Sequence, residues 1–160
     1  MITAEMLVQK LEDRFYRRSS PLELVYWAKS LIFNHFQGKP IATGENANLV
    51  EAIVLRVSNS STNYRVFLFD KELQQHLLSL GKKCEKPNEA LYGFNLIVSG
   101  HKARLFEVLG DKLTKYIVET REHGPTILIS CEGLTEEQIH ELAACLRDFD
   151  YVLSLRDSSA

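Results

Sequence analysis

Short apolar runs alternate with helix-like segments along the second half of the chain, and this alternation restricts the fold more than any other feature. The runs lie at residues 64–69, 94–98, 126–131 and 151–155. The segments between them carry apolar side chains at helical spacing. Because parallel strands need a crossover that is usually a helix, this order predicts βαβ units and a largely parallel sheet.

The earliest of these strands is expected to belong to a hairpin. Residues 52–58 (AIVLRVS) and 64–69 (YRVFLF) are rich in β-branched and aromatic side chains and flank the polar residues 60–63. A short hairpin cannot join parallel strands, so strand 52–58 would be the one antiparallel member. The predicted α/β fold is therefore a hairpin leading into βαβαβαβ, with a mostly parallel sheet of about five strands.

Two helices are expected before the sheet. Residues 3–17 show a helical apolar pattern, with Thr3 available as the N-cap. A capping box with Ser20 and Glu23, and proline at the first helical position, begins a second helix that continues to Gly38. We expect one α/β domain over residues 1–160, in which the helical pair 1–38 packs on or extends from a sheet domain at 48–156.

Composition sets limits on the partners. Of the 160 residues, 45% are hydrophobic and 25% charged, which is ordinary for a globular domain. The net charge of −2 and the pI near 6.2 argue against a nucleic-acid partner. No apolar run approaches the ~20 residues of a membrane span, and the first residues lack the positive charge of a secretory signal. We therefore expect a cytoplasmic protein that does not bind membranes.

The cysteines and histidines point to no cofactor. The three cysteines are odd in number and none forms a C-x-x-C pair, which is typical of a reducing compartment without a disulfide framework. The five histidines are scattered without metal-binding spacing. The sequence therefore predicts neither a metal site nor a cofactor.

A strand-to-helix corner at residues 99–102 is the first candidate ligand site. Gly100 permits a tight turn, and the following helix would direct its free amide groups toward a bound anion. His101 and Lys102 would add donors or positive charge. The competing interpretation is structural: Ser99 caps the helix and Gly100 makes the turn, because one glycine falls short of the known phosphate-loop patterns.

A parallel sheet would widen this site into a rim. Ligands of open parallel sheets bind beyond the carboxyl ends of the strands. If the strands are parallel, Cys131 and Arg156 stand at the carboxyl ends of two further strands. They would then line one rim together with Ser99, Gly100, His101 and Lys102. We expect such a rim to bind an anionic or phosphate-bearing group.

Catalytic patterns are incomplete. Ser99 and Lys102 have the spacing of a serine nucleophile and its lysine base, but the partner motifs of such enzymes are missing. Cys131 and His101 would form a thiol–imidazole pair only if neighbouring strands brought them together, and Glu132 would disfavour the thiolate. The sequence therefore favours a non-catalytic protein without excluding an enzyme.

An aromatic pair in the second helix suggests an interaction surface. Tyr26 and Trp27 fall outside the main apolar stripe of that helix, and both residue types are enriched in interface hot spots. The alternative is a helix buried on two sides. The leading functional hypothesis is a small regulatory or interaction protein that recognises a protein, including a second copy of itself as a homodimer.

Two alternatives accompany this hypothesis. The first is the ligand-binding domain or enzyme that uses the corner at 99–102. The second is a nucleic-acid-binding domain that uses the loop lysines Lys82, Lys83 and Lys86 near Tyr92, although Glu85 and Glu89 dilute that charge.

Overall fold

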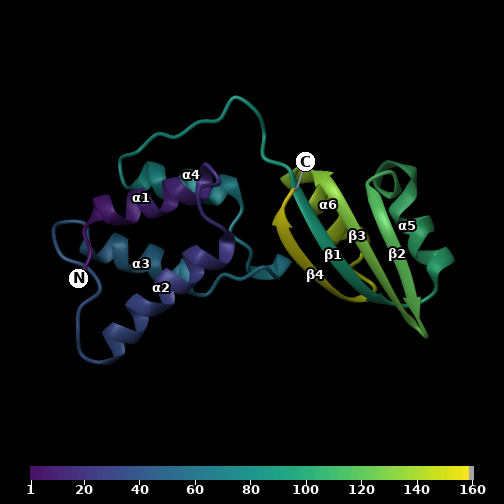
Figure 1. Cartoon of the computed structure of the whole chain (residues 1–160), viewed down its shortest axis with the longest axis horizontal. Helices are drawn as coiled ribbons and strands as arrows, with labels where there is room; N and C mark the ends of the chain where they lie inside the picture. Colours follow the sequence, from purple (N-terminus) through teal and green to yellow (C-terminus); the bar gives the residue numbers. More distant parts are fainter. Residues whose placement is uncertain (159–160) are drawn as a thin grey trace. The chain divides into compact units, whose positions relative to one another are not determined.

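The chain forms two compact units in the computed structural model, which describes residues 1–158 (Figure 1). Unit 1 contains residues 1–62 and 66–87. Unit 2 contains residues 63–65 and the chain from residue 88 onward. Each unit is described separately.

Unit 1 is helical. Its α-helices are α1 (Ala4–Phe15), α2 (Pro21–Phe36), α3 (Ala47–Ser58) and α4 (Asp70–Ser79). The two helices expected at the amino terminus are confirmed, together with their caps. Thr3 accepts a hydrogen bond from the N–H of Met6, and Ser20 and Glu23 form the reciprocal capping box. These caps satisfy N–H groups that have no partner within the helix.

The four helices of unit 1 enclose one apolar core. It includes side chains with at most 3% of their surface exposed from each helix, among them Leu7, Leu11, Val50, Val54, Leu73 and Leu77. Burial of each such side chain contributes about 1.5 to 3 kcal/mol before the entropy of ordering is counted.

The predicted hairpin at 52–58 and 64–69 is wrong. Residues 52–58 belong to α3, and the chain from Tyr64 to Val66 forms a single 3-10 turn, η1. Val50, Ile53, Val54 and Val57 are all buried, and their spacing of three, one and three residues is that of a helix face. Tertiary packing of this face outweighs the β-propensity of its valines and isoleucine.

Unit 2 contains a four-stranded sheet and two helices. The elements are β1 (Tyr92–Ser99), α5 (Lys102–Thr114), β2 (Ile117–His123), β3 (Thr126–Leu134), α6 (Glu136–Cys145) and β4 (Asp150–Asp157). The strand order is β2-β3-β1-β4, and every neighbouring pair is antiparallel. This βαββαβ order is the split βαβ, or ferredoxin-like, topology.

The expected five-stranded, mostly parallel sheet is therefore wrong, although a mixture of helices and strands was rightly expected. The difference in strand direction arises at residues 117–123, where strand β2 replaces the end of a predicted long helix. A turn at Gly124 and Pro125 then joins β2 to β3 as a hairpin, so that β3 runs opposite to β1. Both helices connect strands that are not neighbours in the sheet.

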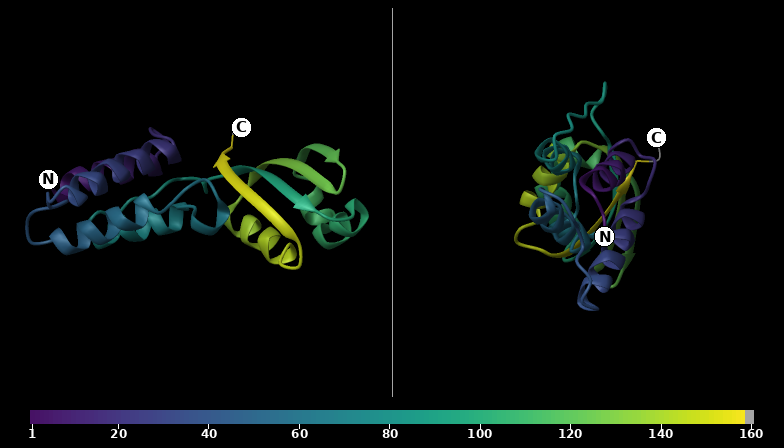
Figure 2. Two further views of the ribbon diagram at one scale, coloured as in Figure 1. Left: turned by 90° about the horizontal axis from the view of Figure 1, so that it is seen from below. Right: turned by 90° about the vertical axis from the view of Figure 1, so that its left-hand side faces the viewer.

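The helices α5 and α6 pack on the same face of this sheet (Figure 1 and Figure 2). Alternate residues of β1, Tyr92, Phe94, Leu96 and Val98, are at most 1% exposed. They pack on the side of the helices, which contribute buried residues such as Leu105 and Ile139. The opposite face of the sheet is the part of unit 2 that the helices leave accessible.

Candidate functional site

The accessible side of the sheet, here called the open face, is ordered into rows by the strand register. Each row crosses the strands in the order β2, β3, β1, β4. The first row is His123, Thr126, Ser99 and Asp150; the second is Arg121, Leu128, Ile97 and Val152; the third is Glu119, Ser130, Asn95 and Ser154. An apolar row thus lies between two polar rows.

Three side chains of the second row form an aliphatic band, namely Leu128, Ile97 and Val152. Ile97 is 45% exposed and Val152 51% exposed, while Leu128 is half-buried. Neighbouring strands lie about 4.8 Å apart, so the band is continuous over β3, β1 and β4. Contiguous exposed apolar groups rimmed by polar residues are typical of interaction sites.

A shallow hollow of about 330 Å³ lies beside the aliphatic band. Its lining includes Ile97 and Leu128 from the band, Ser130 and Asn95 from the polar row, and the ion pair between Arg121 and Glu119. In that pair Arg121 Nε lies 2.6 Å from Glu119 Oε1, with both side chains more than half exposed. The hollow therefore offers an apolar wall and hydrogen-bonding groups at one place.

A hydrogen-bond network centred on Arg156 adjoins this hollow and shares Asn95 and Ser130 with it. Arg156 Nε and Nη2 both donate to Glu132 Oε1, at 2.9 and 2.6 Å. Its Nη1 donates to Asn95 Oδ1 at 3.0 Å, and Nη2 also donates to Ser130 Oγ at 3.1 Å. The network joins β1, β3 and β4, so these side chains are held in place before any partner binds.

The lack of a side chain at Gly93 leaves space for the Glu132 carboxylate of this network. A Cβ atom at residue 93 would lie 2.4 Å from Glu132 Oε2, much closer than any ordinary contact. Gly93 pairs with Arg156 in the sheet, so the Glu132 carboxylate folds over the bare glycine to reach the guanidinium. A glycine in a strand interior is typical of such close approach.

The corner at residues 99–102 lies at the opposite end of β1 from Arg156. Ser99 ends β1, and His101, rather than Ser99, occupies the N-cap position of α5 without a side-chain capping bond. Gly100, with a φ of +143°, donates its N–H to the carbonyl of Pro125 in the β2–β3 turn. Gly100 thus makes the tight turn that the sequence predicts.

A hollow of about 510 Å³ is present at this corner, but its charges are mixed. Its lining contains Gly100, His101, Lys102 and also Glu122. Lys102 Nζ lies 3.6 Å from Glu122 Oε1, so the lysine already forms an ion pair with a carboxylate. The anion-binding hypothesis stays a prediction, because the mixed charges at this corner give it no further support.

The expected rim that would join this corner to Cys131 and Arg156 does not form. Ser99 pairs with Thr126 and Asp150, whereas Cys131 pairs with Phe94 and Arg156 with Gly93. Because β3 and β4 run antiparallel to β1, their carboxyl ends lie beside its beginning. His101 and Cys131 are consequently at opposite ends of the sheet and do not form a thiol–imidazole pair.

Cys131 is a buried thiol on the helix side of β3. It is 3% exposed, and burial raises its pKa to about 12. The thiolate is the reactive form of cysteine, so this residue is unsuited to nucleophilic chemistry in the folded protein.

The raised pKa of Cys131 has a measurable consequence at alkaline pH. Between pH 9 and 12 the unfolded thiol loses its proton and the folded thiol keeps it, so stability falls as pH rises through this window. We expect the native chain to lose about 1 kcal/mol between pH 8 and 10 relative to Cys131→Ala, as measured by urea unfolding. Equal pH dependence of both proteins would contradict this assignment.

Tyr26 and Trp27 have different environments in α2. Tyr26 is 64% exposed, whereas Trp27 is half-buried and packs against the core of unit 1. Leu22 and Phe33 lie on the same face of α2 as Tyr26 and are 45% and 63% exposed. The interaction predicted for this aromatic pair stays untested, with Tyr26 as its accessible member.

A hydroxyl–imidazole–carboxylate series in unit 2 resembles a catalytic triad only in its order. Tyr64 Oη lies 2.7 Å from His140 Nδ1, and His140 Nε2 lies 3.2 Å from Glu136 Oε2. Burial raises the pKa of Tyr64 above its usual value, which disfavours the phenolate. We interpret the series as a structural attachment of residues 63–65 to α6.

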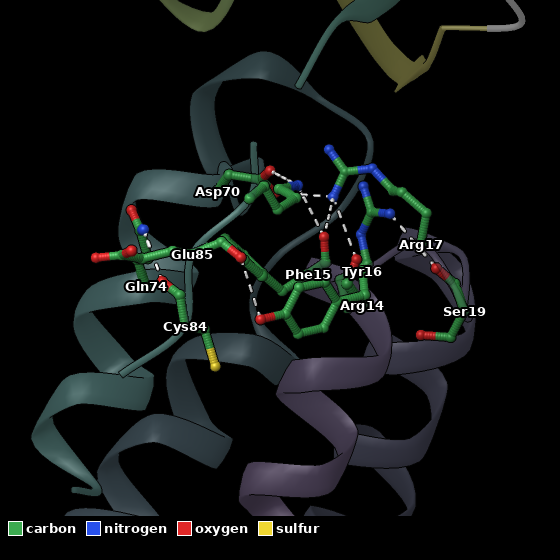
Figure 3. Close-up of polar contacts among 10 residues, drawn as sticks. Arg14, Phe15, Tyr16, Arg17, Ser19, Asp70, Gln74, Cys84 and Glu85 are labelled. Atoms are coloured by element: carbon green, nitrogen blue, oxygen red, sulfur yellow. Dashed lines mark hydrogen bonds and ion pairs between the residues drawn. The ribbon is translucent and has the colours of Figure 1, made fainter. Parts of the chain in front are cut away.

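Unit 1 contains a charged cluster around Asp70 that is also structural (Figure 3). Arg17 Nη1 donates to Asp70 Oδ1 at 2.8 Å, and Lys86 Nζ donates to Asp70 Oδ2. The same cations donate to carbonyl groups at the end of α1, at Arg14 and Phe15. Positive charge at the end of α1 and a carboxylate at the start of α4 both complement the helix dipoles.

The comparisons with known proteins give no relative. No family model matches the chain, and no curated protein or solved structure matches it significantly. Among residues 1–158, no group of three or more metal-ligating side chains is arranged to hold an ion. In the same range no helix is both long and apolar enough to span a bilayer.

Most of the open face was not predicted from the sequence. Arg156 was expected to bind an anion, yet its guanidinium is engaged by Glu132, Asn95 and Ser130. A signal was present in the period-2 alternation of polar and apolar residues within the strands. Asn95, Ser130 and Ser154 each stand between buried apolar neighbours, which is typical of a sheet covered on one face only.

Proposed function

We propose that this chain is a non-catalytic recognition protein that binds a protein partner through the open face of unit 2. The observation that carries the proposal is the aliphatic band, exposed and bounded on both sides by polar rows. The complementary partner surface has an aliphatic centre and hydrogen-bonding groups at its edges. The Arg156 network supports this function, because prearranged side chains reduce the entropy that binding costs.

The side chains of the open face favour protein over RNA. Four-stranded sheets that bind single-stranded RNA stack bases on aromatic side chains at the sheet surface. In the three rows of the open face the apolar positions are occupied by leucine, isoleucine and valine. The net charge of −2 also provides no general attraction for a phosphate backbone.

The absence of disulfides agrees with a reducing location. Cys84, Cys131 and Cys145 are all free thiols, and the first two are buried. We therefore propose the cytoplasm as the compartment in which recognition takes place.

Site-specific photo-crosslinking tests the proposed function. A photoreactive benzoylphenylalanine would replace Ile97 on the open face or, as a matched control, Leu78, which is 62% exposed on α4. We expect discrete protein adducts from residue 97, lost when Val152 is also changed to lysine, and few adducts from residue 78. RNA adducts, or equal labelling from both positions, would overturn the proposal.

A further inference from the structure

We propose that the partner of the open face is a second copy of this chain, packed sheet against sheet about a two-fold axis. This inference rests on the proposed function, because it names the partner for the same surface. Most oligomers of soluble proteins are homo-oligomers, and a two-fold interface must be complementary to itself. The rows of the open face meet this condition.

The strand order fixes which residues would face each other. A two-fold axis parallel to the strands and midway between β3 and β1 exchanges β3 with β1 and β2 with β4. Every row then faces the same row of the second copy. Leu128 of each copy faces Ile97 of the other, so these two side chains of each aliphatic band are buried against the second copy.

The polar rows are complementary under the same rotation. His123 of each copy faces Asp150 of the other, and Ser130 faces Asn95. Arg121 faces Val152, whereas a two-fold axis running along the row would place Arg121 against itself. The axis parallel to the strands therefore keeps the two Arg121 side chains apart and places the His123 imidazole opposite the Asp150 carboxylate.

The size of the face predicts a reversible dimer. The strands contain seven to nine residues, so the sheet covers about 500 Å² of each copy at about 3.4 Å per residue and about 4.8 Å between strands. A stable interface buries about 800 Å² per partner. We therefore expect a dimer that forms in the micromolar range and dissociates on dilution.

Sedimentation of the 160-residue chain over a concentration series tests this inference. We expect native protein to be largely dimeric at about 100 μM, and Ile97→Lys to raise the dissociation constant at least tenfold. Leu78→Lys, the matched control on α4, is expected to behave as native protein. Val152→Lys repeats the test at a second position of the band. Resistance of the buried Cys131 to alkylation verifies that unit 2 of these variants is folded, and Trp27 fluorescence does the same for unit 1 of Leu78→Lys.

A charge exchange tests the orientation of the two copies. His123→Glu and Asp150→Lys are each expected to weaken the dimer several-fold, and the double variant is expected to restore it, since a glutamate of each copy then faces a lysine of the other. Failure of the double variant to restore association would overturn the two-fold arrangement.

The outcomes separate this inference from the proposed function. A native chain that stays monomeric at about 100 μM, or a dimer unaffected by Ile97→Lys, would overturn the second copy as partner. Under that result, adducts from residue 97 to a different protein would leave the proposed function intact. Adducts with twice the mass of the chain would support both.

Discussion

Replacing Asp70 with alanine is expected to destabilise unit 1 by about 2 to 3 kcal/mol. The Asp70 carboxylate forms ion pairs with both Arg17 and Lys86, and its side chain is only 14% exposed. Without it the two cations would lie close together at the end of α1 with reduced access to water. The expected loss of unfolding free energy is smaller than for a fully buried ion pair, because Arg17 and Lys86 are 25% and 19% exposed.

Trp27 gives a direct readout of this loss. It is the only tryptophan of the chain and packs against the unit 1 core, so its fluorescence during urea unfolding reports on unit 1. Glu85→Ala is the matched control, since its ion pair with Lys83 is 71% and 80% exposed and should contribute less than about 1 kcal/mol. Similar unfolding midpoints for the two variants would show that the Asp70 cluster is not structural.

Replacing Gly93 with alanine is expected to destabilise unit 2 by about 2 kcal/mol. The added Cβ would overlap the Glu132 carboxylate, with 2.4 Å to Oε2, and force it away from Arg156. The overlap is relieved when the flexible Glu132 side chain moves, so the cost comes from the lost ion pair and the lost charge-assisted hydrogen bonds between Arg156 and Glu132.

A double-mutant cycle isolates this cause. In the background of Glu132→Ala the carboxylate is absent, so adding Gly93→Ala should cost less than about 0.5 kcal/mol. Alkylation of the buried Cys131 during urea unfolding reports on unit 2. An equal cost of Gly93→Ala in both backgrounds would show that the glycine is needed for another reason.

The local signals of the sequence were sufficient for most helices. The capping box at Ser20 marks the start of α2, as expected, and a second capping box at Thr135 marks the start of α6. Apolar residues at helical spacing likewise predicted α1 and α4. These signals act within a few residues, so the rest of the fold does not alter them.

The direction of the strands could not be obtained in the same way. The segment from Ile117 to His123 has mostly exposed or half-buried side chains, so it lacks the apolar run that marks a strand. Its identity depends on pairing with β3 across the turn at Gly124 and Pro125. Without this strand, the sequence pattern predicts that each helix is a crossover between parallel strands, which would place Cys131 and Arg156 on the same rim as Ser99.

Helix α3 shows how composition and spacing can conflict. Its valines and isoleucine favour a strand, but Val50, Ile53, Val54 and Val57 are spaced for one face of a helix. The periodicity was the better signal, because burial of that face in the unit 1 core determines the structure. The alternation of polar and buried apolar residues around Asn95 and Ser130 similarly indicates a sheet with one open face.

Methyl NMR of the 160-residue chain tests most directly whether the open face binds a second copy. Unlabelled protein would be added to a dilute sample labelled at isoleucine, leucine and valine methyl groups. We expect shifts or broadening at Ile97, Leu128 and Val152, and none at the buried Ile129 or at Leu22 on α2. Changes confined to Leu22, or spectra of the open face that do not change with concentration, would contradict a second copy as the partner of this surface.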